Sequence, residues 1–176
     1  MNIWHDVPAG DNIPSLVNAI IEIPRRSRAK YEICKETGLL RLDRMLYSAV
    51  HYPANYGFIP QTLGEDHDPV DVMVISYIDA VPLCLMRARP IGVMHMVDNG
   101  EVDDKIIAIC EDDMSVTHMS ELEHLPPHFT SEIEHFFSEY KRLEKKEVQV
   151  QAFQGKEAAW KVINDGVARY KEKFGK

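Results

Sequence analysis

The chain has 176 residues, of which 45% are hydrophobic, and its formal net charge is −8 with an isoelectric point near 5.5. This length and composition suffice for one domain with a hydrophobic core, and because no Gly-, Ser- or Pro-rich linker divides the sequence we expect a single domain over residues 1–176. The negative charge disfavours a nucleic-acid-binding surface and an anionic membrane surface. Any phosphate group that the protein binds must therefore meet a local cluster of cations.

Cysteine usage and the N-terminal residues bear on the compartment. The three cysteines are odd in number and widely spaced, which indicates neither a disulfide framework nor a zinc site, and we expect buried, reduced thiols. The N-terminal residues contain no basic segment followed by an apolar one, and no window approaches the roughly 18 apolar residues of a membrane span. The sequence therefore predicts a cytoplasmic protein without a membrane partner.

Period-two alternation predicts short strands in the first quarter of the chain, over residues 17–23, 30–33 and 40–43. In the first of these, four apolar residues at positions 17, 19, 21 and 23 alternate with Asn18, Ile20 and Glu22. Glu22 therefore projects from the opposite face, and Pro24 ends the strand. In the second, the apolar side chains are expected to join the core. The side chains left free for chemistry are Glu22, Lys30 and Glu32.

An acidic run follows residues 51–63, whose two prolines, glycine and three aromatic residues predict a structured loop. Asp66, Asp68 and Asp71 fall within six residues, and the run continues into a predicted buried strand over 72–75. Three like charges at a strand entrance are unfavourable unless a positive group lies between them, and the run contains no Lys or Arg. A hard divalent cation such as Mg²⁺ resolves this conflict. The alternative is a solvated turn built from Asp and Pro.

The next apolar segment, residues 83–97, is expected to bend at Pro90-Ile91-Gly92. It leads to a second acidic patch over 98–104 and then to a strand over 105–110, in which alternation places Asp103 and Lys105 on one face. Both acidic patches thus lie at strand entrances.

The last third changes to a helical period. A capping box from Ser131 to Glu134 and apolar residues at helical spacing predict a helix over 131–144. A short strand over 148–152 precedes a second helix from about residue 156. Many short strands followed by two helices favour a mainly β, α+β fold, with a small barrel and flanking helices.

Carboxylates that hold Mg²⁺, combined with Lys, Arg and Tyr side chains that bind oxyanions, are what phosphoryl transfer to water needs, because positioning and charge stabilisation dominate that chemistry. The chain offers cations and hydroxyl donors near both acidic patches. They are Lys30, Arg44, Lys105, Lys141, Tyr52, Tyr56 and Tyr140.

Several short motifs follow one another along the chain: Ile21-Glu22-Ile23-Pro24, Lys30-Tyr31-Glu32, Asp43-Arg44, Tyr52-Pro53-Ala54-Asn55-Tyr56-Gly57, Asp66-x-Asp68-Pro69-Val70-Asp71-Val72, Asp98 to Lys105 and Tyr140-Lys141. Their order, from residue 8 to about 145, resembles that of the soluble, barrel-type (family I) inorganic pyrophosphatases. The resemblance implies a five-stranded OB-type β-barrel flanked by two C-terminal helices. It also implies Mg²⁺-dependent hydrolysis of pyrophosphate to two phosphates by direct attack of a metal-bridging hydroxide, without a phosphoenzyme, with several Mg²⁺ ions per active site, and a homohexamer.

The resemblance further implies a role for each matching residue. Asp68 would be the general base. The first catalytic metal would be held by Asp66, Asp71 and Asp103, with Asp71 bridging to a second ion. A metal arriving with substrate would be bound by Asp98 and Asp103, and a further ion would be held through water by Glu22 and Glu32. The phosphate ligands would be Lys30, Arg44, Lys105, Tyr140 and Lys141, and the tyrosines that support nucleophile and substrate would be Tyr52 and Tyr56. Two positions depart from the family pattern, His67 and Asn99.

Other interpretations are less consistent with the residues. Taken singly, the strand glutamates and the lysines fit solvated faces, and Tyr140 fits core packing. A calcium-binding loop would need Gly at its sixth position and Glu at its twelfth, where Asp71 and Tyr77 stand. A phosphatase with an aspartyl nucleophile would place Asp-x-Asp after a strand, whereas here the run precedes one. A nucleic-acid-binding barrel fits the fold but not the charge.

Overall fold

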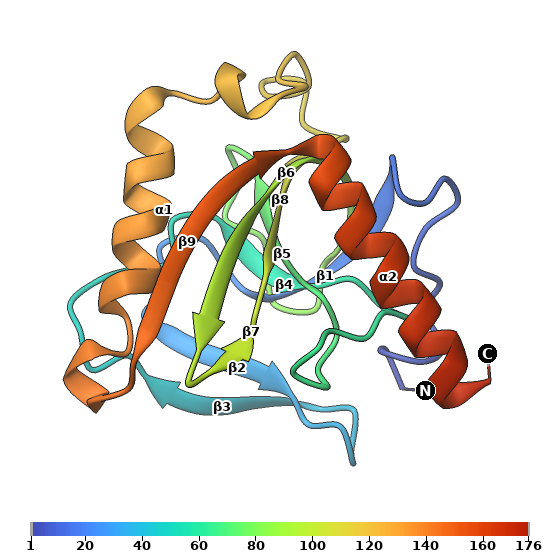
Figure 1. Cartoon of the computed structure of the whole chain (residues 1–176), viewed down its shortest axis with the longest axis horizontal. Coiled ribbons are helices and arrows are strands. Elements are labelled where there is room, and N and C mark those ends of the chain that lie inside the picture. Colours follow the sequence, from blue (N-terminus) through green and yellow to red (C-terminus); the bar gives the residue numbers. More distant parts are fainter. Residues whose placement is uncertain (1, 176) are drawn as a thin grey trace.

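Five strands pair in a closed ring in the computed structural model, which describes residues 2–175 (Figure 1). In order of pairing they are β1 (Val17–Ile23), β4 (Asn55–Phe58), β5 (Asp71–Ile75), β8 (Lys105–Cys110) and β6 (Leu85–Asp98), and β6 returns to β1. The β5–β8 pair is parallel and the other four pairs are antiparallel. Every residue of β8 is buried, as is usual for a parallel strand covered on both faces. The predicted mainly β, α+β class is confirmed.

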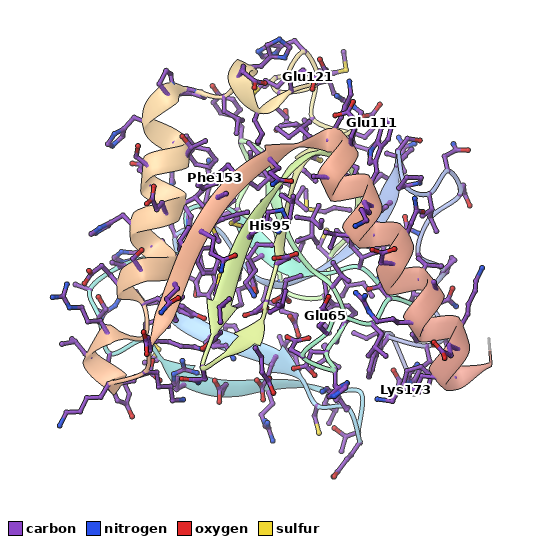
Figure 2. All side chains as sticks on the ribbon, viewed as in Figure 1. Glu65, His95, Glu111, Glu121, Phe153 and Lys173 are labelled. Atoms are coloured by element: carbon purple, nitrogen blue, oxygen red, sulfur yellow. The ribbon has the colours of Figure 1, made fainter. Side chains whose placement is uncertain are left out.

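Strand β6 extends beyond the ring and carries the remaining strands of this sheet. Its register shifts between Pro90 and Gly92, which confirms the predicted bend. It turns through Asn99 and Gly100, whose φ angles of 49° and 87° are both left-handed, into β7 (Glu101–Val102). Such a two-residue turn favours Asn-Gly, so the local backbone accounts for Asn99. Strand β9 (Val148–Gly155), longer than predicted, pairs with β6, and Figure 2 shows His95 and Phe153 on these two strands.

A separate two-stranded sheet consists of β2 (Ala29–Ile33) and β3 (Leu40–Met45). In its register Lys30 lies opposite Arg44, so two predicted phosphate ligands are cross-strand neighbours. Figure 1 shows this sheet below the end of the ring at which β6 turns into β7. Lys30, Glu32 and Arg41 of this sheet line the same cavity as Asp71 and Lys105, the first residues of β5 and β8.

Strand β4 was not predicted, because its residues lie inside the segment interpreted as a loop. Prolines on both sides and Gly57 in its middle hide the strand pattern. The glycine is required by close packing, since a Cβ atom there would lie 1.9 Å from the carbonyl oxygen of Ile20 on β1. Close approach of two backbones, and not a turn, explains this residue.

Two helices flank the ring on opposite sides (Figure 1): α1 (Pro127–Glu139) and α2 (Lys156–Phe174). The start of α2 agrees with the prediction, whereas α1 begins four residues before Ser131 and ends at Glu139. The predicted capping box is therefore interior. The reason is Pro127, which occupies the first helical turn where a missing N–H costs nothing. Two short 3₁₀ helices, η1 (Leu122–His124) and η2 (Arg142–Glu144), precede and follow α1.

The cysteines and the membrane prediction can also be compared with the structure. All three thiols are free, but only Cys110 is buried; Cys34 and Cys84 are half-buried, since both lie at chain turns beside the strands. Within residues 2–175, neither helix combines the length and apolarity that a membrane crossing requires.

Candidate active site

A cavity of about 520 Å³ lies between the β2–β3 sheet, the two acidic segments and the C-terminal end of α1. It brings together thirteen of the fourteen residues that the sequence nominated, from six strands and four connecting segments. Arg44 is the exception and lies beside the cavity. The nominated residues that line it are Glu22, Lys30, Glu32, Tyr52, Tyr56, Asp66, Asp68, Asp71, Asp98, Asp103, Lys105, Tyr140 and Lys141.

Lys105 forms the base of this cavity. The parallel register of β5 and β8 places it beside Asp71, and its Nζ lies 2.5 Å from Asp71 Oδ2 and also pairs with Asp103. The hydroxyl of Tyr56 donates to the same Asp71 oxygen at 2.7 Å. Lys105 is only 2% exposed, and although burial lowers the pKa of its amine, the charges of Asp71 and Asp103 raise it above its ordinary value. Lys105 is therefore a permanent buried cation.

Asp98 lies at the end of β6, where the C-terminal end of α1 approaches. Lys141 forms an ion pair with Asp98 Oδ2, and the Tyr140 hydroxyl donates to the same oxygen at 3.3 Å. The other carboxylate oxygen, Oδ1, is buried and has no hydrogen-bond partner within residues 2–175. Since a buried carboxylate oxygen without a partner is costly, this atom is available to a cation.

The acidic loop holds Asp66 and Asp68 in different surroundings. Asp66 is the more buried, and burial, followed by the negative charge of Asp103, raises the pKa of Asp66 to about 6. Its Oδ1 accepts a hydrogen bond from the backbone N–H of Asp68 at 3.1 Å. Asp68 itself is half exposed and pairs with Lys35. Between them His67 has a φ of 68°, a left-handed conformation in which glycine or a small polar residue is favoured.

Glu22 of β1 and Glu32 of β2 also line the cavity. The Oε1 atom of Glu22 accepts a hydrogen bond from the backbone N–H of Ile33 at 2.6 Å, but burial dominates and raises the pKa of Glu22 to about 8. Burial also raises the pKa of Glu32, yet its bonds with Arg41 and Lys30 outweigh that effect and lower it overall. Two glutamates of one cavity thus differ in charge near neutral pH.

Buried tyrosines cover the inner wall. Tyr52 and Tyr56 have ring centroids 5.2 Å apart, and Phe136 of α1 packs against Tyr52 at 4.6 Å and Tyr140 at 5.4 Å. Burial is the main cause that raises the pKa of Tyr52, Tyr56 and Tyr140 above its ordinary value. All three hydroxyls therefore remain protonated hydrogen-bond donors. The apolar stripe of α1 both packs the core and positions Tyr140.

Lys30, Arg44 and Lys141, for whose charges the sequence indicated no structural partner, are all paired with carboxylates. Lys30 pairs with Glu32 at 3.3 Å and with Asp43 at 3.1 Å. Arg44 pairs with Asp43 and with Glu144, at 2.9 Å for the latter. Lys35, Arg41, Asp43 and Glu144 were not nominated. Asp43 was adjacent to Arg44 in a quoted motif, whereas the contact with Glu144, 100 residues away, had no signal in the sequence.

The residues fit a hard divalent cation. Across residues 2–175 no three Asp, Glu, His or Cys side chains gather in a metal-binding arrangement, because the amines of Lys105, Lys141 and Lys35 stand between or against the carboxylates. The donors are nevertheless all oxygen atoms, as Mg²⁺ prefers, and Asp98 Oδ1 is buried without a partner. Release of the lysines would leave several carboxylates facing one space.

Comparisons with known proteins agree with this geometry. Residues 19–171 match the family model described as "Inorganic pyrophosphatase". The chain is 50% identical to "Soluble inorganic pyrophosphatase 2" of Chlamydomonas reinhardtii, over 97% of this chain and 89% of that protein. It is 49% identical to "Soluble inorganic pyrophosphatase 1" of Arabidopsis thaliana, over 96% of this chain and 80% of that protein.

Solved structures give the same result for the fold. The crystal structure of the inorganic pyrophosphatase from Thermus thermophilus superposes with a TM-score of 0.94 at 37% sequence identity, and covers 97% of this chain and 99% of that chain. With a family model that spans most of the sequence, and relatives about half identical over nearly all of it, the chain belongs to the inorganic pyrophosphatase family.

Proposed function

We propose that the chain hydrolyses inorganic pyrophosphate to two orthophosphates by direct attack of water, with Mg²⁺ as its cofactor and no phosphoenzyme. The observation that carries this proposal is the single cavity in which thirteen nominated residues meet. The relatives named as soluble inorganic pyrophosphatases support the choice of substrate. In this reaction water accepts the phosphoryl group of pyrophosphate, so no second substrate is required.

The carboxylates have separate tasks in this proposal. Asp66, Asp71 and Asp103 would hold one catalytic Mg²⁺ with Asp71 shared by a second, Asp98 and Asp103 would receive an ion that arrives with pyrophosphate, and Glu22 and Glu32 would hold a further ion through water. Bound Mg²⁺ would neutralise phosphate charge and lower the pKa of water. Asp68 is more exposed and lies at the mouth of the cavity, where it accepts the proton of the attacking water as general base.

The cations and tyrosines bind the substrate. Lys30, Lys105 and Lys141 exchange their carboxylate partners for phosphate oxygens, and Arg44 exchanges one of its two. Together they stabilise the charge that develops on the leaving phosphate. The protonated hydroxyls of Tyr52, Tyr56 and Tyr140 donate hydrogen bonds. Tyr56, which already donates to Asp71, is the tyrosine best placed to orient the attacking water.

Further features of the proposal concern the assembly and the setting. We assign the whole chain, residues 1–176, to one domain whose ring of five strands is an OB-type barrel. We propose a cytoplasmic homohexamer that includes contacts of the segment 131–144 and has no nucleic-acid or membrane partner. Large exposed apolar side chains, such as Tyr77 and Val81 at 70%, support association. Sedimentation at the mass of a 20.2 kDa monomer at micromolar concentration would contradict it.

The test of the activity is phosphate release from pyrophosphate, measured with Mg²⁺ and after exhaustive chelation. We expect hydrolysis only with the cation. An Asp71→Asn variant should lose activity, while Asp112→Asn, which changes an exposed carboxylate paired with Arg87, should not. Acid quenching with radiolabelled pyrophosphate should trap no phosphoprotein. Hydrolysis that survives chelation, or a trapped phosphoprotein, would contradict the metal dependence or the direct attack respectively.

A further inference from the structure

The ion pair between Arg44 and Glu144 joins two parts of the site that are 100 residues apart in sequence. Arg44 Nη2 donates to Glu144 Oε2 at 2.9 Å. Glu144 belongs to η2, which follows Tyr140 and Lys141, whereas Arg44 lies on β3. Figure 1 shows the turn after α1 beside the end of β3. The pair therefore ties the β2–β3 sheet to the segment that carries two further substrate ligands.

Glu144 is too deeply buried to be an ordinary surface partner. Its side chain is 6% exposed and that of Arg44 is 18% exposed, and the only other ion pair of Glu144 among the described residues is with Lys146, at 3.7 Å. Buried ion pairs contribute little net stability, because desolvation offsets their attraction. A role in orienting Arg44 accounts for the burial better than a role in stability.

The guanidinium of Arg44 is held at both of its terminal nitrogens. Nη1 bonds to Asp43 and Nη2 bonds to Glu144, while Nε is buried and has no hydrogen-bond partner in the described part of the chain. A planar group bonded at two ends has a fixed orientation. Asp43 alone would not fix it, because the same Asp43 oxygen also accepts a hydrogen bond from Lys30 at 3.1 Å. Without Glu144, two cations would compete for one carboxylate.

We infer that Glu144 is a positioning residue that holds Arg44 while a phosphate group of the substrate takes the place of Asp43 at Nη1. This inference rests on the proposed function. Asp43 is the partner that gives way, because its side chain is 29% exposed and is readily solvated. Glu144 has a side chain that is only 6% exposed, and without Arg44 this buried charge would keep, among the described residues, only the longer pair with Lys146, at 3.7 Å.

The experiment compares Glu144→Ala and Glu144→Gln with the wild type at saturating Mg²⁺. Loss of the anchor weakens phosphate binding before and during reaction, so KM should rise on the order of tenfold in Glu144→Ala with kcat little changed. Glu144→Gln keeps an acceptor oxygen for Nη2, so its KM should rise less. Glu139→Ala is the matched control, since Glu139 lies at the end of α1 and pairs with the exposed Arg142. It should behave as the wild type.

A double-mutant cycle separates positioning from a general structural effect. In an Arg44→Ala background, Glu144→Ala should cause no further loss of kcat/KM, whereas a loss that multiplies with that of Arg44→Ala would overturn the inference. Unchanged KM in both Glu144 variants would overturn it too. If Glu144→Ala does not fold, Glu144→Gln carries the comparison.

Imidodiphosphate is a pyrophosphate analogue that resists hydrolysis. Its binding tests the role of Glu144 separately from the proposed hydrolysis of pyrophosphate. Its Kd, measured by calorimetry, should rise in Glu144→Ala in parallel with KM. A wild type that binds the analogue but releases no phosphate would refute the proposed function, while the difference in Kd between wild type and variant would still decide the role of Glu144. Equal Kd values would refute the positioning role.

Discussion

Replacement of Glu22 by Gln should stabilise the metal-free protein, and by more at pH 7 than at pH 5. Burial raises the pKa of Glu22 from 4.5 to about 8. The pKa of Glu22 is higher in the folded than in the unfolded protein, so deprotonation of Glu22 favours the unfolded state. The free energy of unfolding is therefore at its full value below pH 4.5 and falls as the pH rises towards 8. With about 1.4 kcal/mol per pKa unit, the loss amounts to roughly 1 kcal/mol at pH 5 and about 3 kcal/mol at pH 7.

Gln suits this comparison because it cannot ionise and still presents an oxygen to the backbone N–H of Ile33. Its own burial cost does not depend on pH, so the informative quantity is the change in the stability difference, about 2 kcal/mol between pH 5 and pH 7. The assay is urea denaturation with a chelator at fixed protein concentration. Glu134→Gln makes the same change on an exposed face of α1 and should show no such trend. A Glu22→Gln difference that is equal at both pH values would refute the reasoning.

Three further predictions concern the site. Lys30→Ala and Lys141→Ala should each lower kcat/KM by about 10- to 100-fold in steady-state assays, because a charge-assisted hydrogen bond contributes about 1.5–3 kcal/mol; wild-type values in both would contradict their role. Asp68→Asn should lower kcat by roughly 10²–10⁴-fold with an alkaline shift of the optimum and no rescue by excess Mg²⁺, unlike Asp66→Asn; equal rescue would make Asp68 a metal ligand. His67→Gly should raise the free energy of unfolding by about 1 kcal/mol, since His67 has a φ of 68°; thermal or urea unfolding without a gain would exclude strain there.

The elements that sequence could predict are those whose pattern is local. Strand β1 and the start of α2 follow from alternation and helical spacing, and both agree with the structure. The bend of β6 follows from Pro90 and Gly92. By contrast, β4 was missed because Gly57 is required by the close approach of the β1 backbone, which the local sequence does not reveal. The start of α1 was missed because proline, which interrupts a helix in its interior, is tolerated in the first turn, where Pro127 lies.

In the candidate site, too, some residues could be predicted from the sequence and others could not. Carboxylates at strand entrances could be recognised from the chain alone, and the fold does bring them into one cavity. Their partners could not be recognised, because ion pairs such as Lys35 with Asp68 and Arg44 with Glu144 join segments that only the tertiary structure brings together. The sequence therefore identified which groups are present, while the structure adds which of them neutralise one another.

This mutual neutralisation has a consequence for binding. Carboxylates and cations of the cavity pair with each other, as Lys105 does with Asp71 and Lys141 with Asp98, so that the concentrated negative charge does not repel pyrophosphate as a whole. On the proposed function, substrate and Mg²⁺ break these pairs together: the cations gain phosphate oxygens and the carboxylates gain metal ions. Either ligand alone would leave one set of buried charges without partners, which is costly. Binding of pyrophosphate and of the cation should therefore strengthen each other, and equal analogue affinity with and without Mg²⁺ would show that the two are independent.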